Sequence, residues 1–138
     1  MKSIIICGSI SASDEMLKAE EALRQQGLEV EIPWGVKKYR DNNFIHVSEG
    51  ERAKDKKEND LIKRYYEHIK EYDAVLVVNA DKKGIRYYIG GNTFLEMGFG
   101  YVLGKHLFVL NPLPDVSYRD EMEAMSPIIL NGDLSLIK

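Results

Sequence analysis

The order of segments along this 138-residue chain predicts an α/β fold, a three-layer sandwich around a five-stranded parallel sheet. Two observations carry this prediction. The runs SIIICG (residues 3–8) and DAVLVVNA (residues 73–80) are apolar almost throughout, which is typical of strands buried on both faces. Segments with a helical spacing of apolar residues separate such runs, and this alternation favours βαβ units with right-handed crossovers.

The first half of the chain contains two predicted strands and one clear helix. After the strand at residues 3–8, a helix starts near Ser13 and ends at Gly27, a residue type suited to close a helix. Residues 28–33 alternate between apolar and polar and stop at a proline, so they predict a short second strand. No regular period is visible from residue 34 to about residue 50.

The second half supplies the remaining elements. We expect helices at residues 51–72, 93–103 and 118–125, and strands at residues 73–80, 106–111 and 127–130. Five strands in a chain of this length fit a flavodoxin-like or Rossmann-like, doubly wound sheet. In such a sheet ligands bind beyond the carboxyl ends of the strands, where the strand order reverses.

The composition predicts one globular domain, residues 1–138. Hydrophobic residues make up 44% and charged residues 30% of the chain, and the formal net charge is −3. This charge gives no field that would attract a nucleic acid polymer or an anionic membrane, and no apolar run is long enough to span a bilayer. The N-terminal run MKSIIICGS is too short for a signal peptide, and a single cysteine, Cys7, fits a reducing cytoplasm. We expect Cys7 to be a small buried thiol.

One carboxylate, Glu96, interrupts the segment YIGGNTFLEMGFGYVLGKHLFVLN (residues 88–111). Thr93 and Glu96 match a capping box, in which the threonine caps the helix and the glutamate reaches back to the cap amide. The other interpretation is catalytic, because a carboxylate near a helix N-terminus is held ionised by the helix dipole and can attack an acetal-like carbon. The two interpretations do not exclude each other.

The residues around this glutamate favour the catalytic interpretation. Helical spacing places Asn92, Glu96 and Gly100 on one face, which forms a polar wall without a bulky side chain. Gly98 and Gly104 each cost a helix about 1 kcal/mol relative to alanine. That cost suggests that the backbone approaches something closely.

The segment CGSISAS (residues 7–13) follows the first strand directly. Gly8 permits a tight turn, and the hydroxyls of Ser9, Ser11 and Ser13 stand near free amides at the start of a helix. Such groups suit a phosphate or a ribose hydroxyl. The dinucleotide fingerprint G-x-G-x-x-G is absent, and a plain serine-rich turn is the alternative interpretation.

The three histidines, His46, His68 and His106, are scattered, and none has a partner at metal-ligand spacing. A serine or cysteine nucleophile also lacks its motif, because no G-x-S-x-G is present. We therefore expect neither a metal ion nor a cofactor.

Three stretches of the chain form a recognisable set: Gly8-Ser9 after the first strand, YDAVLVV (residues 72–78) and GGNTFLEMGFGYVLGK (residues 90–105). Together they resemble the nucleoside 2-deoxyribosyltransferase family, which includes 2′-deoxynucleoside 5′-monophosphate N-glycosidases. The resemblance spans about residues 2–111, and its most specific part is the glutamate-glycine-lysine pattern of the last stretch. It implies a flavodoxin-like fold, in agreement with the pattern of elements.

The resemblance implies an enzyme that breaks the N-glycosidic bond of a 2′-deoxynucleoside or its 5′-monophosphate. Glu96 would attack C1′, expel the base and form a glycosyl-enzyme ester, which water or a second base then resolves. The substrate, with its 5′-phosphate, would be held by residues after the first strand and before the catalytic helix: Gly8, Ser9, Ser11, Gly90, Gly91 and Asn92.

Two positions depart from the pattern of that family. A tyrosine in the first strand, which orients the nucleophile, corresponds to Ile5, and an aspartate that handles protons on the base corresponds to Tyr65. A phenol can donate a proton to a departing base but is a poor base at neutral pH, so Tyr65 is the expected donor. Asp81, Tyr87 and Tyr88 are close enough in sequence to take over the same task.

The resemblance also implies a pocket that a neighbouring subunit completes. Asn131 and Asp133 in the segment NGDLSLIK are the candidates, and a surface turn built on Asn-Gly is the alternative. Tyr65, Tyr66 and Tyr72 lie near one side of the helix expected at residues 51–72 and predict an aromatic contact surface. We therefore expect a homodimer or a higher homo-oligomer.

Two other functions remain open at this stage. GGNTFLE also resembles the G-G-x-G-T-x-x-E loop of phosphoribohydrolases that release cytokinin bases, although it is one residue shorter. A non-catalytic Rossmann-like module that senses a nucleotide is the second alternative. The preferred base, the acceptor, and the choice between nucleoside and 5′-monophosphate are also open.

Overall fold

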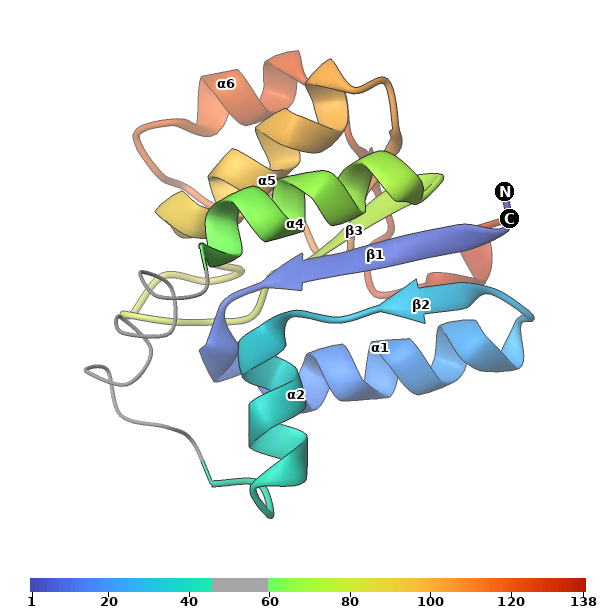
Figure 1. Cartoon of the computed structure of the whole chain (residues 1–138). Helices are drawn as coiled ribbons and strands as arrows, with labels where there is room; N and C mark the ends of the chain where they lie inside the picture. Colours follow the sequence, from blue (N-terminus) through green and yellow to red (C-terminus); the bar gives the residue numbers. More distant parts are fainter. Residues whose placement is uncertain (46–59) are drawn as a thin grey trace.

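The structure, a computed structural model, describes residues 1–45 and 60–138. At its centre lies a sheet of five strands, all parallel, in the order β2-β1-β3-β4-β5 (Figure 1). The strands are β1 (Ser3–Gly8), β2 (Glu29–Glu31), β3 (Ala74–Val78), β4 (His106–Val109) and β5 (Ile128–Ile129). This order reverses between β1 and β3, as in flavodoxin-like doubly wound sheets, so the predicted fold class is confirmed.

The two central strands are buried along their whole length. β1 and β3 pair in register from Ile4 with Ala74 to Gly8 with Val78. Every residue of both strands is buried, as the continuous apolar runs predicted. The edge strands β2 and β5 are short, with three and two residues.

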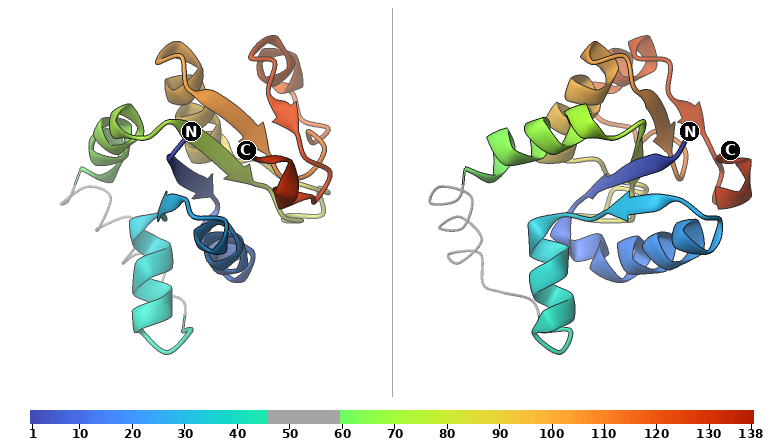
Figure 2. Two further views of the ribbon diagram at one scale, coloured as in Figure 1. Left: turned by 90° about the vertical axis from the view of Figure 1, so that its right-hand side faces the viewer. Right: turned by 45° about the vertical axis from the view of Figure 1, so that its right-hand side comes forward.

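Helices cover both faces of the sheet (Figure 2). One face packs against α1 (Ser13–Gln25), with α2 (Trp34–Asp41) beside it. The other face packs against α4 (Leu61–Glu71), α5 (Gly91–Val102) and α6 (Arg119–Ala124). Short 3₁₀ turns complete the chain, η1 at Ile10–Ala12 and η2 at Leu134–Leu136.

Helix α2 is the element that the sequence did not predict. It has eight residues, and only Val36 and Tyr39 are buried. Two buried positions in two helical turns are too few to produce a visible period of apolar residues, which explains why α2 was not predicted. Tyr39 also ties α2 to α1, since its hydroxyl donates a hydrogen bond to Asp14 at 2.9 Å.

The other predicted elements exist with shifted ends. The helix expected at residues 51–72 is present as α4, which starts at Leu61, and residues 51–59 lie outside the described residues. The strands expected at residues 106–111 and 127–130 are shorter than expected. Within residues 1–45 and 60–138, no helix has the length and apolar character that crossing a membrane requires.

The expected aromatic contact surface on α4 is not there. Tyr65 is 8% exposed and belongs to the core beneath α4. Tyr66 packs edge-to-face on Phe99 of α5, with ring centroids 5.1 Å apart. Tyr72 is partly buried against the same core. The three rings thus pack within the chain, so the aromatic argument for a dimer was wrong, and the homo-oligomer stays a prediction without that support.

The carboxylate of Asp73 links the starts of β1 and β3 at the amino-terminal edge of the sheet. Asp73 accepts hydrogen bonds from the backbone N–H groups of Lys2 at 2.6 Å and Ser3 at 3.1 Å. The N–H of Asp73 donates in turn to the hydroxyl of Ser3 at 3.1 Å. The donation from Lys2, followed by that from Ser3, lowers the pKa of the Asp73 carboxyl below its ordinary value. The two chain ends lie close together at this edge (Figure 1).

Candidate active site

A cavity of about 750 Å³ opens at the carboxyl edge of the sheet. Its walls come from the turn after β1, the start of α2, the helix α4, the loop after β3 and the first turns of α5. The volume is that of a small-molecule site, and the place is the reversal of strand order between β1 and β3. The cavity gathers eight of the predicted site residues: Gly8, Ser9, Ser11, Tyr65, Gly90, Gly91, Asn92 and Glu96.

Glu96 lies in the second turn of α5, not in the first. The helix begins at Gly91 with Gly90 as its N-cap, and no side chain caps it. Thr93 is therefore the third helical residue, and the capping box predicted for Thr93 and Glu96 is wrong. The dipole argument also weakens, because the effect falls off beyond the first turn. Glu96 is only 7% exposed and faces the cavity.

Gly100 does not keep a polar face open, contrary to expectation. It is buried, and a Cβ atom there would lie 2.8 Å from Cγ2 of Val75 in β3. At Gly100 it is therefore the sheet that α5 approaches closely, whereas a Cβ atom at Gly98 would meet only Cε of Met125, at 3.9 Å. Gly104 has φ +74°, a backbone conformation that favours glycine, and it follows the end of α5.

The carboxylate of Glu96 lies beside the thiol of Cys7 on β1. Cys7 is fully buried, as expected. Burial raises the pKa of its thiol well above the ordinary value, and the negative charge of Glu96 and a hydrogen bond to that carboxylate raise it further. The thiol therefore stays protonated and donates to Glu96, which helps to hold the carboxylate.

Tyr65 of α4 is a neutral phenol at the same place. Burial raises its pKa well above the ordinary value, and the negative charge of Glu96 adds to that effect. Its hydroxyl donates a hydrogen bond to the carbonyl of Ile6 in β1. The one proton that Tyr65 can give is therefore engaged by the backbone.

A lysine joins the two serines after β1. The hydroxyls of Ser9 and Ser11 lie 3.0 Å apart, and Nζ of Lys82 donates to Ser9 at 2.9 Å. The same cavity wall contains the first turn of α5, from Gly91 onward. First-turn N–H groups have no partner within their helix and favour an anion. Lys82, the two hydroxyls and these amides together form a site suited to a phosphate.

The loop that carries Lys82 is fixed by a buried asparagine. Asn79 at the end of β3 donates to the carbonyls of Tyr87, Asn111 and Pro112 at 3.2, 3.3 and 3.0 Å. Its own side-chain oxygen accepts from the N–H of Asn111 at 3.0 Å. This strand-end residue therefore positions the loop and does not line the cavity.

Of the three residues expected to take over the task of the missing aspartate, only Tyr88 lines the cavity. Asp81 accepts a hydrogen bond from the N–H of Tyr87 at 2.9 Å, and neither residue lines the cavity. Tyr88 does line it, next to Gly90, where a Cβ atom would lie 3.2 Å from the tyrosine ring.

Asn131 and Asp133 lie away from the cavity within one chain. Asn131 has φ +50° and Gly132 φ +84°, which is the Asn-Gly turn of the alternative interpretation. Asp133 caps η2, since it accepts from the N–H of Ser135 at 3.0 Å and from its hydroxyl at 2.6 Å. The Ser135 hydroxyl, followed by the N–H, lowers the pKa of Asp133. A contribution to a neighbouring subunit stays a prediction.

Several cavity residues were missed from the sequence. They are Trp34 and Lys37 of α2, Arg64 and His68 of α4, and Lys82 and Lys83 of the loop after β3. Lys82 and Lys83 stand within the strand-end segment already expected to face a ligand, so position alone could have indicated them. The residues of α2 could not be found, because that helix was not predicted. Among the described residues, no group of three or more His, Cys, Asp or Glu side chains is placed to hold a metal ion.

Comparison with known proteins gives little beyond this geometry. No family model matches the chain, and no curated protein matches it. Among solved structures, that of the CMP N-glycosidase BcmB from Clostridium botulinum is similar, with 17% sequence identity and a TM-score of 0.49. The similarity covers 93% of this chain and 85% of that one. A likeness at this level says nothing of what this chain acts on.

Proposed function

We propose that this protein cleaves the N-glycosidic bond of a 2′-deoxynucleoside 5′-monophosphate, with Glu96 as the nucleophile. The observation that carries the proposal is the presence of a buried carboxylate and a phosphate-type site on one helix, in one cavity. Glu96 follows Asn92 by four residues, which is about 6 Å along a helix axis. A pentose spans such a distance between the carbon that bears the base and the phosphate on its other end.

The surroundings of Glu96 suit attack on C1′. An exposed carboxylate would be solvated by water, whereas this one is 7% exposed and lies beside the Cys7 thiol. The reaction begins when a carboxylate oxygen bonds to C1′ and the bond from C1′ to the base nitrogen breaks. Water then attacks C1′ of the glycosyl ester and restores the carboxylate, and a second base in place of water would make the protein a transferase.

The 5′-phosphate would bind at the start of α5. Lys82 supplies a positive charge, Ser9 and Ser11 supply hydroxyls, and the amides of Gly91 and Asn92 supply backbone donors. Held there, the substrate is oriented with C1′ towards Glu96, which converts attack into a step within one complex. A bare nucleoside lacks the group that this end of the cavity is suited to hold.

Tyr65 has a different task from the proton donation that the resemblance implied. Its hydroxyl proton is engaged by Ile6, so we assign it to packing beside the carboxylate. Trp34, with 41% of its surface exposed, lines the cavity on the side of α2 and offers a flat surface for a base.

Incubation with a substrate panel tests the proposal. The four deoxynucleoside 5′-monophosphates, the corresponding deoxynucleosides and the ribonucleotides are incubated with the protein, and free base is separated by chromatography. We expect base release from a deoxynucleoside monophosphate, with kcat/KM at least about tenfold higher than for its nucleoside, because a charged hydrogen-bond set is lost.

The other outcomes separate the remaining possibilities. Release from ribonucleotides alone would indicate the phosphoribohydrolase alternative. Equal rates for nucleoside and monophosphate would refute the phosphate site. Tight binding of a monophosphate with no base released under any condition would refute catalysis and leave the sensing module.

A further inference from the structure

His68 lines the same cavity from α4, one turn after Tyr65. The two rings are neighbours, with centroids 6.3 Å apart. The described cavity wall also contains lysines, an arginine, tyrosines and Glu96, and His68 is the one side chain there of a type that ordinarily gains or loses a proton near neutral pH.

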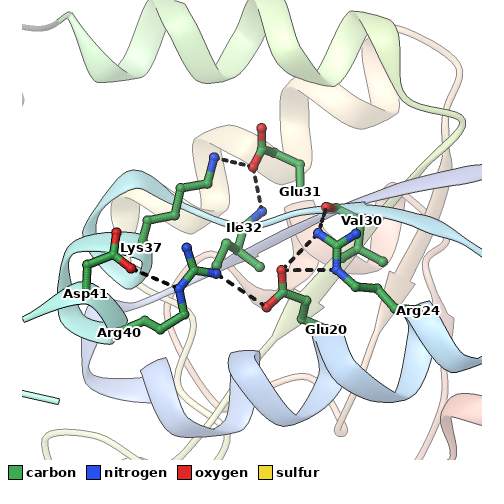
Figure 3. A network of polar contacts seen from close by, with 8 residues as sticks. All are labelled: Glu20, Arg24, Val30, Glu31, Ile32, Lys37, Arg40 and Asp41. Atoms are coloured by element: carbon green, nitrogen blue, oxygen red, sulfur yellow. Dashed lines mark hydrogen bonds and ion pairs between the residues drawn. The ribbon is translucent and has the colours of Figure 1, made fainter. Parts of the chain in front are cut away.

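Glu31 at the end of β2 lies beside this histidine. One carboxylate oxygen, Oε1, accepts from Nζ of Lys37 at 2.5 Å and from the N–H of Ile32 at 3.0 Å (Figure 3). Those two contacts fix the carboxylate. The other oxygen, Oε2, lies 3.6 Å from Nδ1 of His68. Glu31 is therefore positioned to attract a proton on Nδ1, which leaves Nε2 as the ring nitrogen for another partner.

The reaction proposed for Glu96 needs a proton donor on the side of the base. When the bond between C1′ and the base nitrogen breaks, both electrons leave with the base, which becomes an anion unless it gains a proton. The hydroxyl of Tyr65 donates a hydrogen bond to the carbonyl of Ile6, and Lys37 is paired with Glu31. His68 lines the cavity from α4, together with Trp34 and Lys37 of α2, and is not part of the phosphate-type site.

We propose that His68, held by Glu31, is the general acid that protonates the departing base. In the first step Glu96 bonds to C1′, the glycosidic bond breaks, and the proton of Nε2 passes to a nitrogen or oxygen of the base. In the second step water attacks C1′, its proton passes to the neutral imidazole, and the carboxylate of Glu96 leaves. The cycle consumes one water and returns both side chains to their starting state. This assignment rests on the proposed N-glycosidase activity.

The experiment uses two substrates that differ in their need for a proton. One is the deoxynucleotide that the wild-type protein cleaves fastest among dAMP, dGMP, dCMP and dTMP. The other is 4-nitrophenyl 2-deoxyribofuranoside 5-phosphate, whose leaving group is stable as an anion. The variants are His68→Gln, Glu31→Gln and, as the matched control, His106→Gln, which changes an exposed histidine at the start of β4.

We expect His68→Gln to lower kcat on the deoxynucleotide by about 10²-fold or more, the ordinary contribution of a general acid. On the nitrophenyl substrate the loss should be less than about fivefold. Glu31→Gln should show the same preference with a smaller loss, and His106→Gln should match the wild type on both substrates. Melting temperatures of all variants check that the fold is intact.

The pH profile adds a second readout. The charged and titratable groups of described residues at this end of the cavity are Glu31 on β2, Lys37 on α2, and Arg64 and Tyr65 on α4. The pH profile of kcat on the deoxynucleotide should differ in shape between the wild type and His68→Gln, and His106→Gln should keep the wild-type profile.

Distinct results overturn the two proposals. If His68→Gln slows both substrates equally, or slows neither, His68 is not the acid. If the wild type cleaves neither substrate, the N-glycosidase activity itself is refuted. If Glu96→Gln abolishes cleavage of both substrates while His68→Gln affects only the deoxynucleotide, both proposals stand.

Discussion

Two carboxylates lie at opposite edges of the sheet, and their surroundings differ in kind. Asp73 at the amino-terminal edge accepts from two backbone N–H groups, and those donors lower its pKa. Glu96 at the carboxyl edge is buried at a cavity, beside a thiol and near a phenol. The first arrangement joins two strands. The second keeps a charge out of water next to a space that a ligand can fill.

The comparison contrasts an acid with a structural role and the acid that we propose to be reactive. Burying a carboxylate costs free energy unless hydrogen bonds to fixed donors offset it. Asp73 is exposed, and the backbone groups that donate to it are already in place. At Glu96 the fold relies on a side chain, Cys7, and on the cavity. Exchanging each acid for its amide should therefore separate stability from activity.

The largest effect is expected at Glu96. Glu96→Gln removes the nucleophile and keeps the size of the side chain, so base release from the deoxynucleotide should fall by at least about 10³-fold. Removing a buried charge should leave the melting temperature unchanged or higher. Product chromatography and thermal unfolding measure the two quantities. Full activity in this variant would contradict the catalytic role.

The next effect concerns the phosphate end of the cavity. Lys82→Met keeps the apolar stem and removes the charge that donates to Ser9. Binding of the 5′-monophosphate should weaken by about 10- to 100-fold, the worth of a hydrogen bond to a charged group, while binding of the nucleoside should not change. Calorimetric titration of both ligands into Glu96→Gln, which should bind without turnover, provides the measurement. Equal weakening for both would contradict a phosphate site.

A smaller effect is expected at Cys7. Cys7→Ala removes the donor that faces Glu96, and kcat should fall by about 3- to 10-fold, the worth of one hydrogen bond from a weak thiol donor. Cys7→Ser retains a donor and should keep more of the activity. If alanine and serine variants have the same kcat, the thiol does not hold the carboxylate.

The smallest effect on activity is expected at Asp73. Asp73→Asn should leave kcat unchanged and lower the melting temperature by a few degrees at neutral pH. Because the folded-state pKa of Asp73 is lowered, its contribution is present above the unfolded-state pKa and is lost as pH falls through the folded-state value. The stability difference between wild type and Asp73→Asn should thus shrink on acidification from neutral pH. A difference independent of pH would contradict this account.

Local patterns in the sequence were sufficient for the scaffold and for Glu96. Each of the apolar runs of β1 and β3 is a continuous stretch of sequence, and the serines follow β1 directly. The end of β1 and the turn after it could therefore be predicted from the sequence. The start of α5 could not be predicted in this way. Thr93 and Glu96 have the spacing of a capping box, whereas the helix begins at Gly91. Spacing alone does not decide which residue is the first of a helix.

The other half of the site depends on contacts between distant segments. Glu31 and His68 are 37 positions apart in the sequence and meet only because α4 packs beside β2. Gly100 has the same origin, since its need for a small residue comes from Val75 on another element. No periodicity contains such information. This explains why His68 was considered only as a metal ligand and rejected, and why Gly100 was assigned to an open polar face.

A covalent intermediate at Glu96 is the most direct test of the account. The protein is incubated with a 2′-deoxy-2′-fluoronucleoside 5′-monophosphate, whose electron-withdrawing fluorine slows formation and hydrolysis of a glycosyl ester, and intact mass and peptide mapping follow. The account predicts an added mass of one fluorodeoxyribose phosphate on Glu96, absent from Glu96→Gln and present in Asp73→Asn. Base release without this adduct, or an adduct that persists in Glu96→Gln, would contradict it.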